Sequence, residues 1–468
     1  MAFKKSASLL LCLILMLTVF LAACGGNNND NKNGNAAPPD NANQQNDKGG
    51  NDEADKQPVE EKHDPVTLTV MNWGGDIDFF TTLYAEFTKK YPWITVKAFG
   101  SGGGDNEALA KMAAMQSSGE DAPDLVWPQS IGKWIEGGNL EDIRPFYEKD
   151  QVVKTLGIPE GFIESWEIDG KIYALPWTDD PWPLVINKDL MKKKGMEMPP
   201  NDWSYDDFLQ MAKTATDPAA GEYGLSNNWI FKSYIPELLA VANGHAPRLG
   251  YMNEDNTQSL FNTPDIQADL KWAADMFNVH KVTMDPETLA KSGIAPDALF
   301  MEGKALFSIA QPLKQLSDMV DFDWDILPLP KGPAGQPGIR NTSPLAMTSA
   351  SKHKEEAWLF IRFQFEYEAN KWRADNIGFA PLVDNQELMD LTESYYKGKN
   401  FEALAIGRKE CCKTYGALIF DSGTLSGITG GAVTGLMDSN KDVSSVFPQI
   451  EDYNKRAAEY WKGLGVMK

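Results

Sequence analysis

The apolar and polar positions of the chain switch between a period of two and a helical period. The β-branched run from Val66 to Met71 predicts a strand. Apolar residues then recur at helical spacing at Phe79, Phe80, Leu83, Tyr84 and Phe87. Two further strands over 94–99 and 124–127 enclose a second helix over 107–115. Because strands that alternate with helices typically form a parallel sheet covered by helices, the sequence predicts an α/β fold.

Helix-start signals continue this alternation toward the C-terminus. The run 204–207, Ser-Tyr-Asp-Asp, is a capping box that predicts a helix as far as about Thr216. A Thr-Pro pair at 263–264 predicts another helix to about Phe277, since proline is favoured at the first helical position. A further helix is predicted from Ser351.

The N-terminus has a different pattern. Two lysines at 4 and 5 precede an apolar run over 9–20 and the small residues of 21–23, which is the layout of a secretory signal. The run is shorter than the roughly 20 residues of a membrane span. A small-small-Cys ending resembles the lipobox of bacterial lipoproteins, which implies removal of residues 1–23 and diacylation of Cys24. The alternative is an ordinary signal cleaved near Ala23.

Residues 25–65 contain almost no apolar side chains. Such a segment cannot bury enough surface to offset its conformational entropy, so we expect it to stay disordered. Random-coil scaling gives it a reach of roughly 35 Å. We therefore interpret 24–65 as a lipidated cysteine followed by a flexible tether.

Composition narrows the function of the remaining 400 or so residues. This length favours two lobes. A net charge of −22 argues against a nucleic-acid partner and against direct docking on anionic lipid. Cys12 leaves with the signal and Cys24 carries lipid. Only the adjacent Cys411 and Cys412 then remain, so no disulfide framework is expected.

Six stretches of the folded part carry a family resemblance. They are APDLVW at 122–127, IYALP at 172–176, LVINKDL at 184–190, FMEGKALF at 300–307, WDILPLP at 324–330 and SPLAMTSA at 343–350. Their order resembles the extracellular solute-binding proteins of ABC importers, in the sugar-binding group that includes maltose-binding protein. The resemblance covers roughly 66–365 and is less clear after Trp372.

The resemblance implies two α/β lobes around a ligand cleft, joined by hinge crossings. We place the crossings near 177–184, 306–310 and 344–347. The predicted N-terminal lobe is 66–178 plus 310–345, and the predicted C-terminal lobe is 184–306 plus 348–468. Hinge closure around the ligand is an established switching mode. The implied molecule is a non-catalytic monomer without cofactor or metal, lipid-anchored at the extracellular face of the cell membrane, and it delivers its ligand to a permease.

Candidate ligand-binding residues lie where strands end in loops, because ligands of open α/β sheets bind beyond the carboxyl ends of the strands. Indole rings pack on the apolar faces of sugars, and carboxylates and amides bind hydroxyl groups, so this combination favours an oligosaccharide. The candidates are Trp73, Asp76, Trp127, Gln129, Trp177, Asp179, Asp180, Trp182 and Trp229. The family resemblance places Asp180 where a cleft carboxylate meets sugar hydroxyls. Any one of these tryptophans could instead be core.

Other readings stay open at this point. Acidic and aromatic residues would also suit a polyamine, through cation–π contacts, and a peptide or other small solute would suit the same fold. A secreted glycoside hydrolase would need two carboxylates that flank the scissile bond. The glycine-rich run 100–104 lacks the ending of a nucleotide P-loop, and the four histidines do not share metal-ligand spacing.

Overall fold

The computed structural model describes residues 63–72, 80–160, 162–163, 166–168, 170–227, 229–295, 298–309, 313–409 and 420–463. Residues 62–468 form one compact unit of the chain. The expected signal 1–23, Cys24 and the tether as far as residue 62 lie outside the described residues. Among the helices that are described, none combines the length and the apolar character that crossing a membrane requires.

The first sheet contains five strands in the order β2-β1-β3-β11-β6. They are β1 (Val66–Asn72), β2 (Ile94–Gly100), β3 (Leu125–Val126), β6 (Ala174–Trp182) and β11 (Ile339–Met347). β1 pairs in parallel with β2 and β3, whereas β11 is antiparallel to β3 and β6. The predicted α/β fold and its parallel start are therefore confirmed.

The second sheet contains four strands in the order β10-β7-β9-β8. They are β7 (Leu184–Asn187), β8 (Tyr223–Leu225), β9 (Ala305–Ile309) and β10 (Trp324–Leu327). All residues of β7 and β9 are buried, as expected for strands covered on both faces. A small hairpin pairs β4 (Glu167–Ile168) with β5 (Lys171–Ile172).

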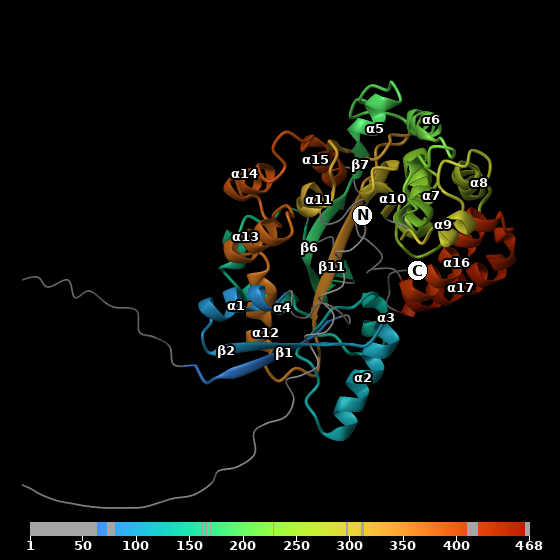
Figure 1. Ribbon diagram of the computed structural model, residues 1–468. Helices are drawn as coiled ribbons and strands as arrows, with labels where there is room; N and C mark the ends of the chain where they lie inside the picture. Colours follow the sequence, from blue (N-terminus) through green and yellow to red (C-terminus); the bar gives the residue numbers. More distant parts are fainter. Residues whose placement is uncertain are drawn as a thin grey trace, which may run out of the picture. The chain divides into compact units, whose positions relative to one another are not determined.

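Two long strands connect the sheets. β6 and β11 pair over most of their nine-residue lengths, and they run side by side from one sheet toward the other in Figure 1. Only Pro183 separates β6 from β7. On β11, Ile339 packs in the core of the second sheet, while Leu345 packs in the core of the first. We call the part around the first sheet the first lobe and the part around the second sheet the second lobe.

Helices surround both sheets. Those associated with the first sheet are α1 (Thr81–Lys90), α2 (Asp105–Ser118), α3 (Ile131–Glu136), α4 (Arg144–Lys149), α12 (Lys354–Phe363) and α13 (Tyr367–Asn376). Those associated with the second are α5 (Lys188–Lys193), α6 (Tyr205–Ala215), α7 (Trp229–Asn243), α8 (Pro264–Asn278), α9 (Pro286–Ser292), α10 (Ala298–Met301) and α11 (Leu313–Met319). The C-terminal part adds α14 (Gln386–Ser394), α15 (Glu402–Lys409), α16 (Ser422–Ser439) and α17 (Phe447–Gly463).

The predicted helix starts are present. The side chain of Ser204 accepts a hydrogen bond from the Asp207 amide, and the Asp207 carboxylate accepts one from the Ser204 amide, so the capping box is complete. Pro264 occupies the first position of α8. The helix predicted from Ser351 begins slightly later, as α12.

The lobe boundaries differ from those predicted in four places. The expected crossing at 344–347 lies inside the first sheet, where Ala346 and Met347 pair with β3. β10, expected in the first lobe with 310–345, pairs along its length with β7 of the second sheet. α12, expected in the second lobe, packs on the first, with Phe360 and Phe363 at 5.0 and 5.3 Å from the ring of Phe87. The expected crossing at 306–310 includes most of β9, which lies inside the second sheet between β7 and β8. Hydrophobic period identifies an element but not the sheet that it joins.

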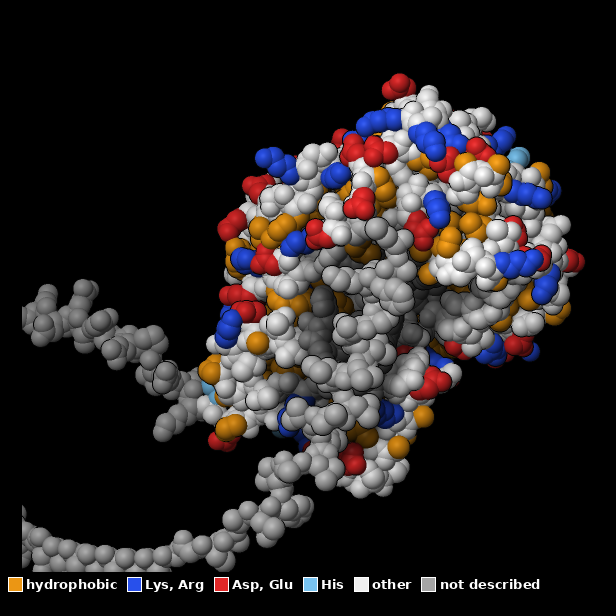
Figure 2. Space-filling view, viewed as in Figure 1, with side chains coloured by type: hydrophobic (Ala, Val, Ile, Leu, Met, Phe, Trp, Pro, Cys, Tyr) orange, Lys and Arg blue, Asp and Glu red, His pale blue; other side chains and the backbone are white. Residues whose placement is uncertain are grey.

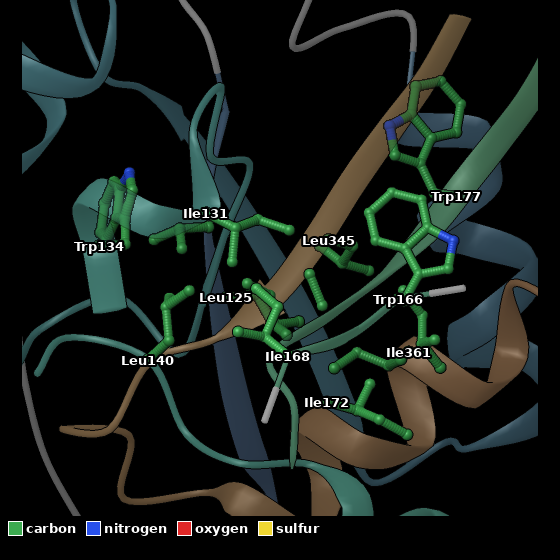
Figure 3. Close-up of a cluster of buried hydrophobic side chains, with 14 of the residues drawn as sticks. Leu125, Ile131, Trp134, Leu140, Trp166, Ile168, Ile172, Trp177, Leu345 and Ile361 are labelled. Atoms are coloured by element: carbon green, nitrogen blue, oxygen red, sulfur yellow. The ribbon is translucent and has the colours of Figure 1, made fainter. Parts of the chain in front are cut away.

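The first lobe is held by a core that Figure 3 shows in part. Leu125 of β3, Ile131 and Trp134 of α3, Ile172 of β5 and Leu345 of β11 are all at most 1% exposed. A fully buried side chain of this size contributes about 1.5–3 kcal/mol through apolar burial. Segments distant in sequence therefore fix the carboxyl ends of β1 and β3.

The glycines of α16 offer a test of helix packing. Gly427 and Gly431 are exposed, and a Cβ added at either would meet no described atom within 4 Å. Because glycine costs about 0.8–1 kcal/mol relative to alanine inside a helix, Gly427→Ala and Gly431→Ala should each raise the free energy of unfolding by about 0.5–1 kcal/mol. Urea unfolding followed by circular dichroism measures this change.

The matched control is Gly224→Ala, where the new Cβ would lie 2.3 Å from the carbonyl oxygen of Ala212 and should destabilise the protein. If both α16 variants instead lower stability, that face of α16 is packed and our interpretation is wrong.

A buried carboxyl group in α7 should make the stability of the protein depend on pH. Glu237 accepts a hydrogen bond from the Gly250 amide at 2.9 Å, and desolvation raises its pKa from 4.5 to about 7. Because the folded state keeps this proton where the unfolded state has lost it, stability falls as pH rises from 4.5 to 7. We expect a loss of about 1–3 kcal/mol across this window.

Glu237→Gln keeps an acceptor for Gly250 and should abolish this contribution, so that it stabilises the protein above pH 7. Unfolding free energies measured at several pH values test the prediction. An unchanged pH profile in the variant would contradict it.

Candidate ligand-binding site

Two of the predicted tryptophans stack at the carboxyl edge of the first sheet. Trp127 follows β3 and Trp177 lies in β6, and their rings are 4.9 Å apart at an interplanar angle of 25°. Phe80, which precedes α1, meets both indoles edge-on at 5.1 and 5.0 Å. Such stacked and edge-on pairs each add about 0.5–1.5 kcal/mol beyond their burial.

A fourth ring comes from α13. Trp372 lies 6.2 Å from Phe80, and its indole N–H donates to the hydroxyl of Thr82 at 2.8 Å. We call these four rings (Phe80, Trp127, Trp177 and Trp372) the aromatic wall. Sequence reasoning missed Phe80, whose helical spacing resembles that of core residues. It also missed Trp372, which lies where the family resemblance becomes unclear.

A β-bulge sets the direction of Trp177. Thr178 pairs with Ser343, but the next pair is Pro176 with Pro344, so Trp177 is the extra residue on β6. Two facing prolines have no N–H groups to donate across the strands, which favours an interruption of the ladder here. Bulges re-aim side chains at functional sites, and this one leaves the Trp177 ring against Trp127 and Phe80.

Three buried polar atoms, on β6, β1 and β11, have no hydrogen-bond partner in the part of the chain that the structure describes. They are the indole Nε1 of Trp177, the Oδ1 of Asn72 and the Oγ1 of Thr342. Asn72 ends β1, and its amide N–H donates to the hydroxyl of Tyr84 at 3.2 Å. Burial raises the pKa of Tyr84, so that this phenol stays neutral. A buried donor or acceptor left unpaired costs about 1–3 kcal/mol, which a ligand hydroxyl can recover.

The other predicted tryptophan of β6 belongs to the second lobe. Trp182 is partly buried against the second core, and its ring lies 6.2 Å from Tyr234 of α7 at an angle of 70°. It lies five positions after Trp177, or roughly 16 Å away at about 3.3 Å per residue of strand. β6 therefore carries one indole into each lobe.

The remaining predicted residues are spread around these two groups. Gln129 is exposed, and its Oε1 would be 2.9 Å from a Cβ added to Gly104. Asp179 and Asp180 lie in β6 opposite Thr342 and Asn341, but their side chains are outside the described set. The same holds for the side chain of Trp229, the first residue of α7, and for the whole of Trp73 and Asp76.

Three hollows are lined by described residues, and none of the three is lined by a ring of the aromatic wall. An apolar cavity of about 30 Å³ lies between Pro181 of β6 and the segment of α13 to α15. Open hollows of about 460 and 350 Å³ lie between α1 and β2 and beside α6 and α8. On the face shown in Figure 2, acidic and basic side chains are interspersed. The described residues bring no three His, Cys, Asp or Glu side chains together as a metal site.

Residues 72–371 match the family model of the bacterial extracellular solute-binding proteins. The chain belongs to this family. A putative binding protein of Brucella abortus is 28% identical over 249 residues, which are 49% of this chain and 56% of that protein. The chain therefore spans little more than half the length of this relative. An uncharacterized lipoprotein of Streptomyces antibioticus is 24% identical over 311 residues, covering 64% of this chain and 66% of the relative.

Solved structures share the fold. An ABC substrate-binding protein of Listeria monocytogenes, in complex with cycloalternan, superposes with a TM-score of 0.71. The two chains are 23% identical, and the match covers 84% of this chain and 99% of that one. The two-lobed fold expected from the sequence is thus confirmed for this member of the family.

Proposed function

We propose that this protein is the substrate-binding component of an ABC importer and that it captures an extracellular oligosaccharide. The observation that carries the proposal is the aromatic wall, in which stacked Trp127 and Trp177 adjoin buried, unpaired polar groups of described residues. A sugar ring presents apolar C–H faces and a rim of hydroxyl groups, so it fits a site that offers flat rings and a few placed polar atoms.

The comparisons support this ligand class. The Listeria protein of the same fold holds cycloalternan. A second candidate ligand is a polyamine, because a net charge of −22 and aromatic rings would also suit a cation. A peptide or another small solute would fit the same fold. The buried indole N–H of Trp177, which has no partner among the described residues, favours the sugar, because it is a hydrogen-bond donor and a polyamine ammonium group offers no acceptor. A secreted glycoside hydrolase is the third hypothesis. Analysis of the sugar products distinguishes a hydrolase from a receptor.

The connections between the lobes support capture by closure. The polypeptide passes between the sheets through β6 and β11, which pair with each other over most of their length. Small changes in the backbone angles of two paired strands can rotate one lobe against the other, which is hinge closure. We propose that the ligand lies between the aromatic wall and the second-lobe pair Trp182 and Tyr234, and that the permease recognises the closed form.

The N-terminus supports an attachment to the membrane. Lys4, the apolar run and the small residues before Cys24 have the order of a lipoprotein signal, and the relative in Streptomyces is named as a lipoprotein. We propose that Cys24 is lipidated and that the polar tether holds the receptor at the extracellular face. Tethering raises the effective concentration of the receptor at its permease.

Thermal shifts against a panel of oligosaccharides and polyamines test the ligand class. An oligosaccharide present at about a hundred times its dissociation constant should stabilise the protein by about 2.7 kcal/mol. Trp177→Phe keeps an aromatic ring but lacks the N–H, so it should weaken binding by about tenfold while the fold stays intact. Asp180→Ala tests one of the two acidic candidates of β6 in the same assay and should also weaken binding.

The matched control is Trp203→Phe, which removes a buried indole N–H in the second core, where it donates to the carbonyl of Pro328. This variant should lose stability but keep its affinity. Stabilisation by polyamines alone would refute the sugar proposal, and release of shorter sugars would indicate a hydrolase.

The lipid anchor has its own test. Cys24→Ala removes the lipidated sulfur, so the protein should move from the membrane fraction to the medium. The released protein should still bind the oligosaccharide with unchanged affinity, because Cys24 precedes the folded unit that starts at residue 62. A variant that remains in the membrane fraction would refute lipidation at Cys24.

A further inference from the structure

Asp105 anchors the segment that carries Trp127. It is the first residue of α2, and its carboxylate is buried, with the residue 8% exposed. One oxygen accepts from the Gln129 amide and from the Trp134 indole N–H, both at 2.9 Å, and the other accepts from the Ser130 amide at 2.8 Å. Three donors from one short segment thus converge on one side chain.

The residue type fits this arrangement. An ionised carboxylate offers only acceptors, whereas the three groups around it are all donors. The N-terminus of α2 adds the positive end of a helix dipole, which favours an anion at this position. Hydrogen bonds to a charged acceptor are roughly twice as strong as neutral ones. Asparagine could keep the shape but would direct an N–H₂ group at one of the donors.

The anchored segment decides where Trp127 lies. At its start, the Trp127 amide donates to the carbonyl of Met71 at 3.2 Å, as a continuation of the β1–β3 pairing. At its end, Asp105 holds the amides of Gln129 and Ser130. The backbone on both sides of the Trp127 indole is therefore fixed, and the stack with Trp177 depends on it.

The same segment also receives contacts from α16 and α17. The Ser422 amide at the start of α16 donates to the hydroxyl of Ser130 at 3.4 Å, and the Tyr460 hydroxyl of α17 donates to the carbonyl of Gly132 at 3.2 Å. α16 packs against α7 and α8 of the second lobe. The loop after β3 therefore contributes both to the aromatic wall, through Trp127, and to a contact with α16, which packs on the second lobe.

We propose that Asp105 is a positioning residue for ligand binding: its buried carboxylate fixes residues 127–130 and thereby orients Trp127 in the aromatic wall. Asp105 does not touch the ligand itself. The proposal rests on the proposed function for its effect on affinity, but its effect on the wall concerns the ligand-free protein.

The test compares Asp105→Asn with Asp124→Asn. Asp124 is an equally buried carboxylate at the other end of β3, where it accepts from the Thr69 amide at 2.8 Å and from the Ser351 hydroxyl at 2.7 Å. Both variants lose a buried charge with several donors, so both should be less stable. Only Asp105→Asn should disturb the wall.

Fluorine NMR of the fluorotryptophan-labelled, ligand-free protein reads the wall directly. The resonances of Trp127 and Trp177, assigned with Trp127→Phe and Trp177→Phe, should shift or broaden in Asp105→Asn and stay in place in Asp124→Asn. Affinity for the oligosaccharide identified by the thermal-shift panel should fall about tenfold in Asp105→Asn only.

Unmoved wall resonances in Asp105→Asn, or equal shifts in both variants, would overturn the proposal. If no oligosaccharide binds to the unmodified protein, the proposed function fails, while the NMR comparison still decides the role of Asp105. Should Asp105→Asn not fold, Asp105→Glu, which keeps the charge and moves the acceptor by one methylene, is read in the same way.

Discussion

The antiparallel pairing of β6 with β11 is the constraint on which the rest of the structure depends. β11 belongs to the first sheet through β3, and β6 continues into β7 of the second sheet after a single residue. β6 and β11 therefore run side by side from one lobe into the other. Because backbone hydrogen bonds hold this connection along most of nine residues, a relative motion of the lobes must bend or twist the pair rather than break it.

An interruption in that pairing produces the candidate site. Facing prolines at 176 and 344 remove two donors, the register shifts, and Trp177 becomes the extra residue between this pair and the pair of Thr178 with Ser343. Its ring joins Trp127, which the β3 loop supplies, and Phe80, which the start of α1 supplies. Trp372 of α13 completes the wall beside Phe80. The site is thus assembled from a hinge strand, the loop after β3, the start of α1 and α13, at the edge of the sheet where ligands of open α/β sheets bind.

Hydrogen bonds from neighbouring residues hold two parts of the aromatic wall in place. Asp105 holds the segment after Trp127, and Thr82 accepts the indole N–H of Trp372. In contrast, the N–H of Trp177 and the Oδ1 of Asn72 are buried with no partner among the described residues. Flat indole rings in fixed positions beside buried polar atoms form the kind of surface that binds a ligand through a few placed polar groups.

The sequence by itself determined the local elements and the class of molecule. Periodicity gave β1, β2 and α2, the Ser204 capping box gave α6, and the ordered motifs gave a family that the match over 72–371 confirms. Local signals suffice for these features because capping and strand alternation act within a few residues. They also drew attention to Trp127 and Trp177 as ligand candidates, although not to their contact with each other.

Only the tertiary structure decided which sheet each later element joins and which rings meet. β10 and α12 lie in the lobes opposite to those predicted. The sequence could not decide this, because an apolar face can pack against either core. Trp177 and Trp182 look alike in sequence, yet the bulge directs one into the aromatic wall while the other packs beside Tyr234. Phe80 and Trp372, 292 positions apart by their numbers, meet only because α1 and α13 pack together. A bulge and a helix contact depend on partners distant in the chain, and such partners leave no periodic signal in the sequence.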